Sequence, residues 1–232
     1  LSYNWNFGDG NTHNIEDPDH TYSLPDTFLV RLLNTSNHGC TDSFDREVIV
    51  FPKPQTAFAV NDTDQCINTN HFTFTANAGI SSGNLTQYWW DLGSGPASGD
   101  LDTALTYLTY GTENIEFITE SEFFCYDTSR QLIEIYPKPQ AEFAVNDSDQ
   151  CVNTNLFSYS NSTTIPYGTL SWFWEFGDGD TSSLDNPDHA FAFHDTLTTV
   201  LYAKSGNDCY DTTSRVVVIL PKPDPQFQIN DT

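Results

Sequence analysis

The sequence predicts an all-β chain built from tandem antiparallel β-sandwiches, on three observations. The tripeptide Pro-Lys-Pro stands at residues 52–54, 137–139 and 221–223, at offsets of 85 and 84 residues, which indicates one folded unit per repeat. Short runs of alternating apolar and polar residues are separated by Asn, Asp, Gly and Ser, and no stretch has a convincing helical period with caps. The five cysteines keep the same period in two series. The first series is Cys40, Cys125 and Cys209, and the second is Cys66 and Cys151.

The period divides the chain into two complete repeats and two partial ones. Residues 54–138 and 139–222 are the complete repeats, each near the lower end of self-sufficient domain size. Residues 1–53 correspond to the C-terminal part of a repeat, and residues 223–232 to the first strand of a further one. We therefore expect the chain to be a window on a longer array.

Within the last complete repeat, alternation predicts five strands. They span residues 141–145, 156–160, 170–176, 198–203 and 214–220. Trp174, with Trp5 and Trp90 as its equivalents, is expected to fill the core between two sheets. Val217 and Ile219 should face the same core from the last strand.

The Pro-Lys-Pro tripeptides mark the ends of the repeats. Proline cannot donate a hydrogen bond to a sheet, and paired prolines favour the extended polyproline II conformation. A short, stiff connection of this kind predicts that the repeats form a semi-rigid rod.

The cysteines predict a disulfide in every complete repeat, because each has one cysteine near its start and one near its end. The expected pairs are Cys66–Cys125 and Cys151–Cys209, with Cys40 lacking a partner in this chain. Regular pairs in small β-rich units indicate an oxidising, extracellular setting. Unpaired buried cysteines are the alternative.

The chain is strongly acidic, with 32 Asp and Glu against 8 Lys and Arg and a formal charge of −24. Such a charge repels nucleic acid and anionic membrane surfaces, so we expect neither as a partner. No run is apolar enough to span a bilayer, so no membrane insertion is expected of this segment.

Two segments carry a recognisable signature. Residues 174–179 read Trp-Glu-Phe-Gly-Asp-Gly and are followed by Asn-Pro-Asp-His-Ala-Phe at 186–191. Residues 5–10 read Trp-Asn-Phe-Gly-Asp-Gly and are followed by Pro-Asp-His-Thr-Tyr at 18–22. The middle repeat departs from the pattern, because residues 90–95 read Trp-Asp-Leu-Gly-Ser-Gly and no Pro-x-His follows.

This signature resembles that of the PKD (polycystic kidney disease) domain. The resemblance implies tandem immunoglobulin-like (PKD-type) sandwiches in an extracellular protein. The version with cysteines and Pro-Lys-Pro linkers is similar to the repeats of large secreted surface proteins of Bacteroidota, including gliding-type adhesins. The middle repeat is assigned to the same fold by its period and cysteines.

The signature residues allow a structural and a chemical reading. Asp9 and Asp178 stand between glycines, as in a tight turn that needs positive φ, although an aspartate there could also bind Ca²⁺. Ser94 replaces this aspartate in the middle repeat, which favours the turn. We expect His20 and His189 to anchor a loop by hydrogen bonds, because no catalytic motif accompanies them.

A second acidic pattern recurs after the first strand of each complete repeat. Its carboxylates are Asp62, Asp64, Asp147 and Asp149. Closely spaced oxygens are what Ca²⁺ prefers, so these residues are candidate calcium ligands, with a solvated acidic turn as the alternative. No cofactor is expected to be required.

Asp-Ser and Asp-Thr pairs are abundant and are similar to the O-glycosylation motif of Bacteroidota. The candidate acceptors are Ser43, Thr103, Thr128, Thr196 and Thr212. Ser43, Thr128 and Thr212 share one place in the repeat. The alternative is that Asp and Thr are simply favoured at exposed strand and turn positions. Asparagine sequons also occur, but they matter only in a host with the corresponding machinery.

Taken with the resemblance, these features predict a non-enzymatic structural segment that forms a rod or fibre of a secreted cell-surface adhesin. Its partners would be neighbouring repeats, identical chains in a filament, or surface polysaccharide. The second hypothesis is a polysaccharide-binding or spacer module attached to a secreted hydrolase. Aromatic residues make up 14% of the chain, and exposed, coplanar aromatics would favour the second hypothesis.

Overall fold

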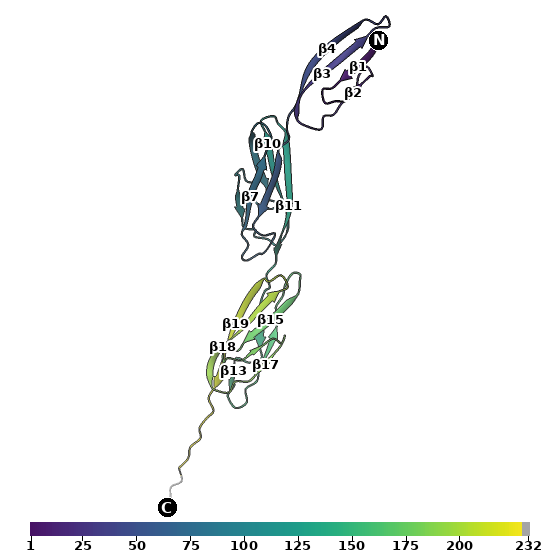
Figure 1. The fold of residues 1–232 in the computed structure, drawn as a ribbon. Helices are drawn as coiled ribbons and strands as arrows, with labels where there is room; N and C mark the ends of the chain where they lie inside the picture. The colour runs from purple at the N-terminus through teal and green to yellow at the C-terminus, as the bar shows by residue number, and fades with distance from the viewer. Residues whose placement is uncertain (229–232) are drawn as a thin grey trace, which may run out of the picture. The chain divides into compact units, whose positions relative to one another are not determined.

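The computed structural model describes residues 1–228, and every regular element in that range is a β-strand (Figure 1). None of the described residues forms a helix long and apolar enough to cross a membrane. The all-β prediction is therefore confirmed. The chain divides into two compact units, and the division passes through the middle repeat. The first unit contains Leu1–Asn61, Thr73–Leu105 and Asn114–Leu132, and the second contains Asp62–Phe72, Thr106–Glu113 and the residues from Ile133 onward.

The N-terminal residues form one four-stranded antiparallel sheet in the order β2-β1-β3-β4. Its strands are β1 (Ser2–Asn6), β2 (Thr12–His13), β3 (Asp26–Thr35) and β4 (Thr41–Val50). β3 and β4 form a long hairpin in register from Asp26↔Val50 to Thr35↔Thr41. This hairpin carries Cys40 in its turn; Cys40, Cys125 and Cys209 are called the late cysteines below, and Cys66 and Cys151 the early cysteines.

The middle repeat contains two sheets. One has the order β5-β7-β9, and the other has the order β6-β11-β10-β8. The strands of the first are β5 (Gln55–Val60), β7 (Phe72–Gly79) and β9 (Thr103–Leu105). The strands of the second are β6 (Asp64–Cys66), β8 (Leu85–Asp91), β10 (Gly111–Ser121) and β11 (Tyr126–Tyr136).

The last complete repeat has the same strand order, with one short strand added. Its sheets run β12-β14-β17 and β13-β19-β18-β15-β16. The strands of the first are β12 (Phe143–Val145), β14 (Phe157–Asn161) and β17 (Asp188–His189). The strands of the second are β13 (Asp149–Cys151), β15 (Leu170–Glu175), β16 (Thr181–Ser182), β18 (Asp195–Ser205) and β19 (Tyr210–Leu220). The middle repeat therefore keeps the common topology although it lacks the full signature.

The five strands expected in the last repeat are all present, with shifted ends. Three short strands, β13, β16 and β17, were not expected, because two or three residues are too few to show an alternating pattern. β13 pairs in parallel with the end of β19, from Asp149↔Val218 to Cys151↔Leu220. Residues 221–228 contain no strand, and the rest of the strand expected at 223–232 lies outside the described residues.

Aromatic side chains fill the core of each complete repeat. Trp174 is fully buried and meets Phe143 edge-on at 5.0 Å between ring centroids. Trp90 is also fully buried and stacks on Phe117 at 4.2 Å. Each indole stays hydrogen-bonded, because the Nε1–H of Trp174 donates to the carbonyl of Leu184 at 2.9 Å and Trp90 donates equivalently to a loop carbonyl. Val217 and Ile219 are buried as predicted.

Trp5 differs from its two equivalents because it is only half-buried. The sequence predicted the same core position for all three tryptophans. Residues 1–53 provide one sheet, whereas each complete repeat provides two. Trp5 nevertheless keeps the equivalent hydrogen bond, from its Nε1–H to the carbonyl of Ile15 at 3.2 Å.

Candidate functional site

The Phe-Gly-Asp-Gly segments form tight turns with positive φ. Gly8 has φ 83° and Gly177 has φ 93°, and a Cβ on either would lie within 3 Å of a carbonyl oxygen on the neighbouring strand. The aspartate closes the turn, since Oδ1 of Asp178 accepts a hydrogen bond from the backbone N–H of Asp180 at 3.1 Å. Asp9 accepts the equivalent bond at 3.0 Å. The predicted turn is confirmed in both repeats.

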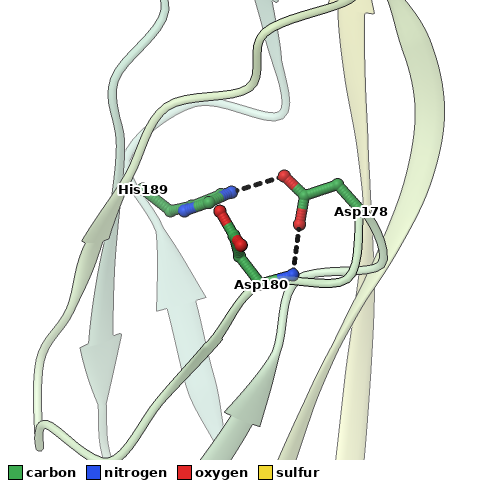
Figure 2. A group of neighbouring side chains, drawn as sticks. All are labelled: Asp178, Asp180 and His189. Atoms are coloured by element: carbon green, nitrogen blue, oxygen red, sulfur yellow. Dashed lines mark hydrogen bonds and ion pairs between the residues drawn. The ribbon is translucent and has the colours of Figure 1, made fainter.

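The signature histidine binds the same aspartate through its second oxygen (Figure 2). His189 Nε2 lies 2.8 Å from Oδ2 of Asp178, and His20 Nε2 lies 2.8 Å from Oδ2 of Asp9. An ionised carboxylate can only accept, so the imidazole N–H is the donor. The ring of His189 stacks on Phe176 at 4.1 Å between centroids, which attaches the loop to the core. The expectation that the histidine anchors a loop is confirmed.

Hydrogen bonding lowers the pKa of these aspartates. Partial burial acts to raise the pKa of Asp9, but hydrogen bonds from Asn11 and His20 outweigh it and hold the pKa at about 2. Asp178 has the same balance, with burial opposed by His189 and the backbone N–H of Asp180, and its pKa is lowered. Both side chains therefore accept hydrogen bonds as carboxylates at neutral pH.

Asp178, Asp180 and His189 form a group whose potential ligand atoms lie within 4.8 Å of one another (Figure 2). An imidazole with two carboxylates is a donor set that divalent transition metals accept. In this group, however, His189 Nε2 already holds the proton that it donates to Asp178. The first repeat keeps the His–Asp pair but has Asn11 in place of Asp180. The element that the two repeats share is therefore a hydrogen-bonded clamp and not a three-ligand set.

A buried asparagine holds the loop that follows the signature, and sequence reasoning missed it. Asn155 donates from Nδ2 to the carbonyl of Phe191 at 3.0 Å and accepts from the N–H of Phe191 at 2.6 Å. Asn70 makes the same two bonds with Tyr107. A sequence pattern could have identified these asparagines, because Asn70 stands four residues after Cys66 and Asn155 stands four residues after Cys151.

Two of the three Pro-Lys-Pro linkers, at residues 52–54 and 137–139, are each held by an aspartate. Lys138 Nζ lies 2.9 Å from Oδ1 of Asp211, while Oδ2 of Asp211 accepts from the backbone N–H of Ala141 at 2.9 Å. In the other compact unit, Asp127 binds Lys53 at 2.6 Å and the N–H of Thr56 at 2.8 Å. Burial acts to raise the pKa of both aspartates, but these bonds outweigh it and lower the pKa. We call this arrangement the linker clamp.

The disulfide prediction is wrong, because the structure joins Cys66 to Cys209. Cys125 and Cys151 are free, as is Cys40. The reason lies in the last strand of each repeat. Cys151 pairs with Leu220 at the end of β19, whereas Cys209 precedes its first residue, so the two are separated by the strand's length of roughly 35 Å. A disulfide requires Cα atoms within about 7 Å.

The observed bond spans the linker instead. Cys66 lies beside Tyr136, the last residue before the Pro-Lys-Pro of residues 137–139. Cys209 lies two residues before Asp211, which binds the lysine of that linker. The S–S distance is 2.02 Å and the Cα atoms are 5.5 Å apart, within the second compact unit. An early cysteine therefore bonds to the late cysteine of the next repeat.

The acidic pairs proposed as calcium ligands are exposed. The N–H of Asp64 lies 3.4 Å from Oδ1 of Asp62, and Asp149 and Asp147 repeat this contact. In the described residues neither pair belongs to a three-ligand group. Calcium binding there stays a prediction.

The glycosylation candidates lie at or near the surface. Ser43, Thr196 and Thr212 are exposed, while Thr103 and Thr128 are half-buried. The preceding aspartates have backbone roles of their own, as Asp127 and Asp211 show in the linker clamp. The recurrence of Asp-Ser/Thr thus has a structural cause, and glycosylation stays a prediction.

The chain is similar to proteins of known fold. A family model described as PKD domain matches residues 1–50 and 136–220, more than half of the chain. The PKD1 domain of Vibrio anguillarum Epp is 23% identical, with 37% of this chain and 96% of that chain covered and a TM-score of 0.33. The PKD1 domain of the Vibrio cholerae metalloprotease PrtV is 19% identical, with 35% and 96% covered and a TM-score of 0.32.

A longer match covers nearly all of the chain. The N-terminal eight Ig domains of Down Syndrome Cell Adhesion Molecule are 15% identical, with 96% of this chain and 33% of that chain covered and a TM-score of 0.54. At this identity the match shows the fold alone, which is immunoglobulin-like.

Proposed function

Because the chain belongs to the PKD domain family, we propose that it is a non-enzymatic structural segment of a secreted cell-surface adhesin, in which tandem repeats form a rod or fibre. PKD and immunoglobulin-like domains are typically non-catalytic and occur in tandem arrays as extracellular adhesion or spacer modules. The disulfide agrees with an extracellular protein. The proposal extends to a rod at the cell surface, in an adhesin of the Bacteroidota type.

The observation that carries the proposal is the repeated linker clamp. At both clamped linkers, residues 52–54 and 137–139, one carboxylate binds the linker lysine and the N–H of a residue just past the linker. Each lysine is flanked by prolines, which restrict the backbone further. A protein that only needed to tether two domains would not require this bonding. Repeating it favours a function that depends on defined spacing.

The signature residues support a structural role rather than a catalytic one. The Nε2–H of His189 is committed to Asp178, and the imidazole stacks on Phe176. Asp178 is committed twice, to the histidine and to the turn. These groups maintain the loop that they belong to.

Labelling of intact cells of the source organism tests the proposal. Antibodies against residues 1–232 should bind unpermeabilised cells, and gold-labelled antibodies should follow surface fibres in electron micrographs. An antibody to a cytoplasmic protein serves as the control for cell integrity. Labelling that appears only after permeabilisation would refute the surface location, and antigen found only in the medium would favour a released hydrolase.

One pair of exposed aromatic residues bears on the polysaccharide-binding alternative. Phe173 and Tyr202 are exposed neighbours on β15 and β18, with ring centroids 6.2 Å apart, and the hydroxyl of Tyr202 donates to Glu175 at 2.9 Å. Their planes meet at 45°, so they do not make the flat platform on which a sugar chain stacks. Affinity electrophoresis in gels containing soluble polysaccharides distinguishes the structural segment from the polysaccharide-binding module. We expect the polysaccharide not to retard the protein. Retardation that the Phe173→Ala variant loses would support the polysaccharide-binding alternative.

O-glycans would suit an exposed fibre that carries few basic side chains. Ser43 and Thr212 are the best acceptors, because they are exposed and hold equivalent places in their repeats. Intact-mass measurement of protein from its native source tests this proposal. A mass equal to the bare polypeptide would remove it.

Bound Ca²⁺ is proposed for the acidic pairs at Asp62, Asp64, Asp147 and Asp149. Isothermal titration of the purified chain with CaCl₂ should show saturable binding that a double Asp147→Asn, Asp149→Asn variant reduces. Equal binding by both proteins would refute these sites.

A further inference from the structure

The five cysteines occupy two places in the repeat, and the backbone defines each place. The early cysteines end a short strand that runs parallel to the end of the repeat's last strand. Cys66 lies beside Tyr136 of β11, and Cys151 lies beside Leu220 of β19. In both cases the cysteine stands next to the residue that precedes a Pro-Lys-Pro linker.

The late cysteines share one turn. In each turn the serine four residues before the cysteine donates its backbone N–H to the cysteine carbonyl. The pairs are Ser36 with Cys40 at 2.8 Å, Ser121 with Cys125 at 3.0 Å and Ser205 with Cys209 at 2.8 Å. The serine hydroxyl also accepts the cysteine N–H in all three, at 3.1, 3.2 and 3.1 Å. The three late positions are therefore alike in structure as well as in sequence.

The bond between Cys66 and Cys209 shows what the two places are for. It joins an early cysteine to the late cysteine of the following repeat, across one clamped linker. An early and a late cysteine of the same repeat cannot pair, because the whole length of β19 separates Cys151 from Cys209. The partner of any early cysteine must therefore come from another repeat.

Three cysteines hold these places without a bond. Cys151 is an early cysteine and is exposed, while Cys40 is a late cysteine and is also exposed. Cys125 is a late cysteine and is half-buried. Residues 1–232 contain no late cysteine after Cys209 and no early cysteine before Cys66.

We propose that these thiols are covalent attachment sites for a further copy of the repeat. Cys151 takes the late cysteine of such a copy, and Cys40 and Cys125 take an early cysteine. The copy belongs either to the same polypeptide or to a second molecule. The inference rests on the proposed array and specifies how its repeats are joined.

The chemistry is oxidation of two thiols. Each pair loses two protons and two electrons as the S–S bond forms. A disulfide oxidant, such as oxidised glutathione, accepts the electrons and is reduced to two thiols. An oxidising extracellular setting supplies oxidants of this class.

A chain with one added repeat tests the same-polypeptide source. A second copy of residues 139–222 is placed directly after Lys222, which preserves a Pro-Lys-Pro linker, and the protein is oxidised in a glutathione buffer. Peptide mapping without reduction should recover Cys151 joined to the added counterpart of Cys209. The matched control carries serine at that added position, and there Cys151 should react fully with N-ethylmaleimide.

The unaltered chain tests the second-molecule source. At high concentration in the same buffer, disulfide-linked oligomers should contain bonds from Cys151 of one copy to Cys40 or Cys125 of another, and Cys151→Ser should abolish them. If only the added-repeat protein forms the bond, the source is the same polypeptide. The proposal would be overturned if Cys151 stays reactive in both the added-repeat protein and the unaltered chain. It would also be overturned if disulfides form only between two early or between two late cysteines. The labelling of intact cells does not depend on these thiols. Failure of the disulfide proposal would therefore leave the proposed surface location unaffected.

Discussion

Asp211 binds Lys138 through Oδ1 at 2.9 Å, and its Oδ2 accepts the backbone N–H of Ala141 at 2.9 Å. One side chain thus holds both the lysine of a linker and the backbone three residues further along. Asp127 does the same for Lys53 and Thr56. The two halves of this arrangement contribute unequally to stability, since an exposed ion pair is weak and an unsatisfied backbone N–H is costly.

The first prediction separates these two halves. Asp211→Ala leaves the N–H of Ala141 without its acceptor and should lower the free energy of unfolding by about 1–2 kcal/mol. Lys138→Ala keeps that bond and should cost less than about 1 kcal/mol. Urea unfolding measures both, with Lys222→Ala as the control because it has the same Pro-Lys-Pro context and no ion pair in the described structure. Equal losses for Asp211→Ala and Lys138→Ala would show that the ion pair dominates.

The second prediction concerns the glycines of the signature turn. Gly177→Ala should destabilise the protein by about 2–4 kcal/mol, because the residue combines positive φ with a Cβ placed 2.8 Å from the carbonyl oxygen of Thr198. Gly179→Ala also has positive φ, but its Cβ would meet nothing within 4 Å, and about 1–2 kcal/mol is expected. Thermal unfolding of the two variants provides the comparison. A larger loss for Gly179→Ala would contradict the geometry.

The third prediction concerns the core tryptophans. Trp174→Ala and Trp90→Ala should each cost about 3–5 kcal/mol, since both side chains are fully buried. Trp5→Ala should cost clearly less, because Trp5 is half-buried. Phe173→Ala is the control, as it removes an exposed aromatic next to Trp174. Differential scanning calorimetry would reveal the order, and equal losses for Trp5 and Trp174 would refute the assigned difference in packing.

The fourth prediction is acid sensitivity. Burial acts to raise the pKa of Asp178, but hydrogen bonds lower it, so this carboxylate stabilises the folded state above its unfolded pKa of about 3.9. That stability is lost as the pH falls through the lower folded-state pKa, which for Asp9 is about 2. Unfolding should therefore become easier between about pH 4 and pH 2.

The Asp178→Asn variant checks this assignment. It should start less stable at neutral pH and lose less on acidification, which urea titrations at several pH values would measure. Asp188→Asn alters an exposed carboxylate in the same repeat and should leave the acid dependence unchanged. If the Asp178→Asn variant loses as much stability on acidification as the unaltered protein, the acid sensitivity arises from other carboxylates.

Local patterns predicted most of the fold. The alternation around Trp174 and Val217 located β15 and β19, because one face of each strand is buried and the other is not. The glycines and aspartate of the signature predicted their turn, because few other residues tolerate positive φ. β13 was not predicted, because three residues are too few to show an alternating pattern. Its parallel pairing with β19 nevertheless positions Cys151.

The candidate site was harder to predict, since its bonds connect residues far apart in the sequence. The early and late cysteines suggested closure within a repeat, but a β-strand of 11 residues holds them at opposite ends. Lys138 and Asp211 each recur with the period, yet their pairing depends on which turn lies beside the linker. Periodicity shows that such residues matter in every repeat, and three-dimensional structure is needed to match them.

The bond between Cys66 and Cys209 also determines how the chain would respond to stretching. A force applied to the two ends passes along the backbone to Cys66, crosses the sulfur atoms and continues from Cys209. Residues 67–208 lie outside this covalent path. Unfolded and fully extended, they would otherwise add roughly 480 Å of contour length. While the disulfide is intact, residues 67–208 cannot contribute this length. The extensibility of this segment therefore depends on the redox state of a single pair of sulfur atoms.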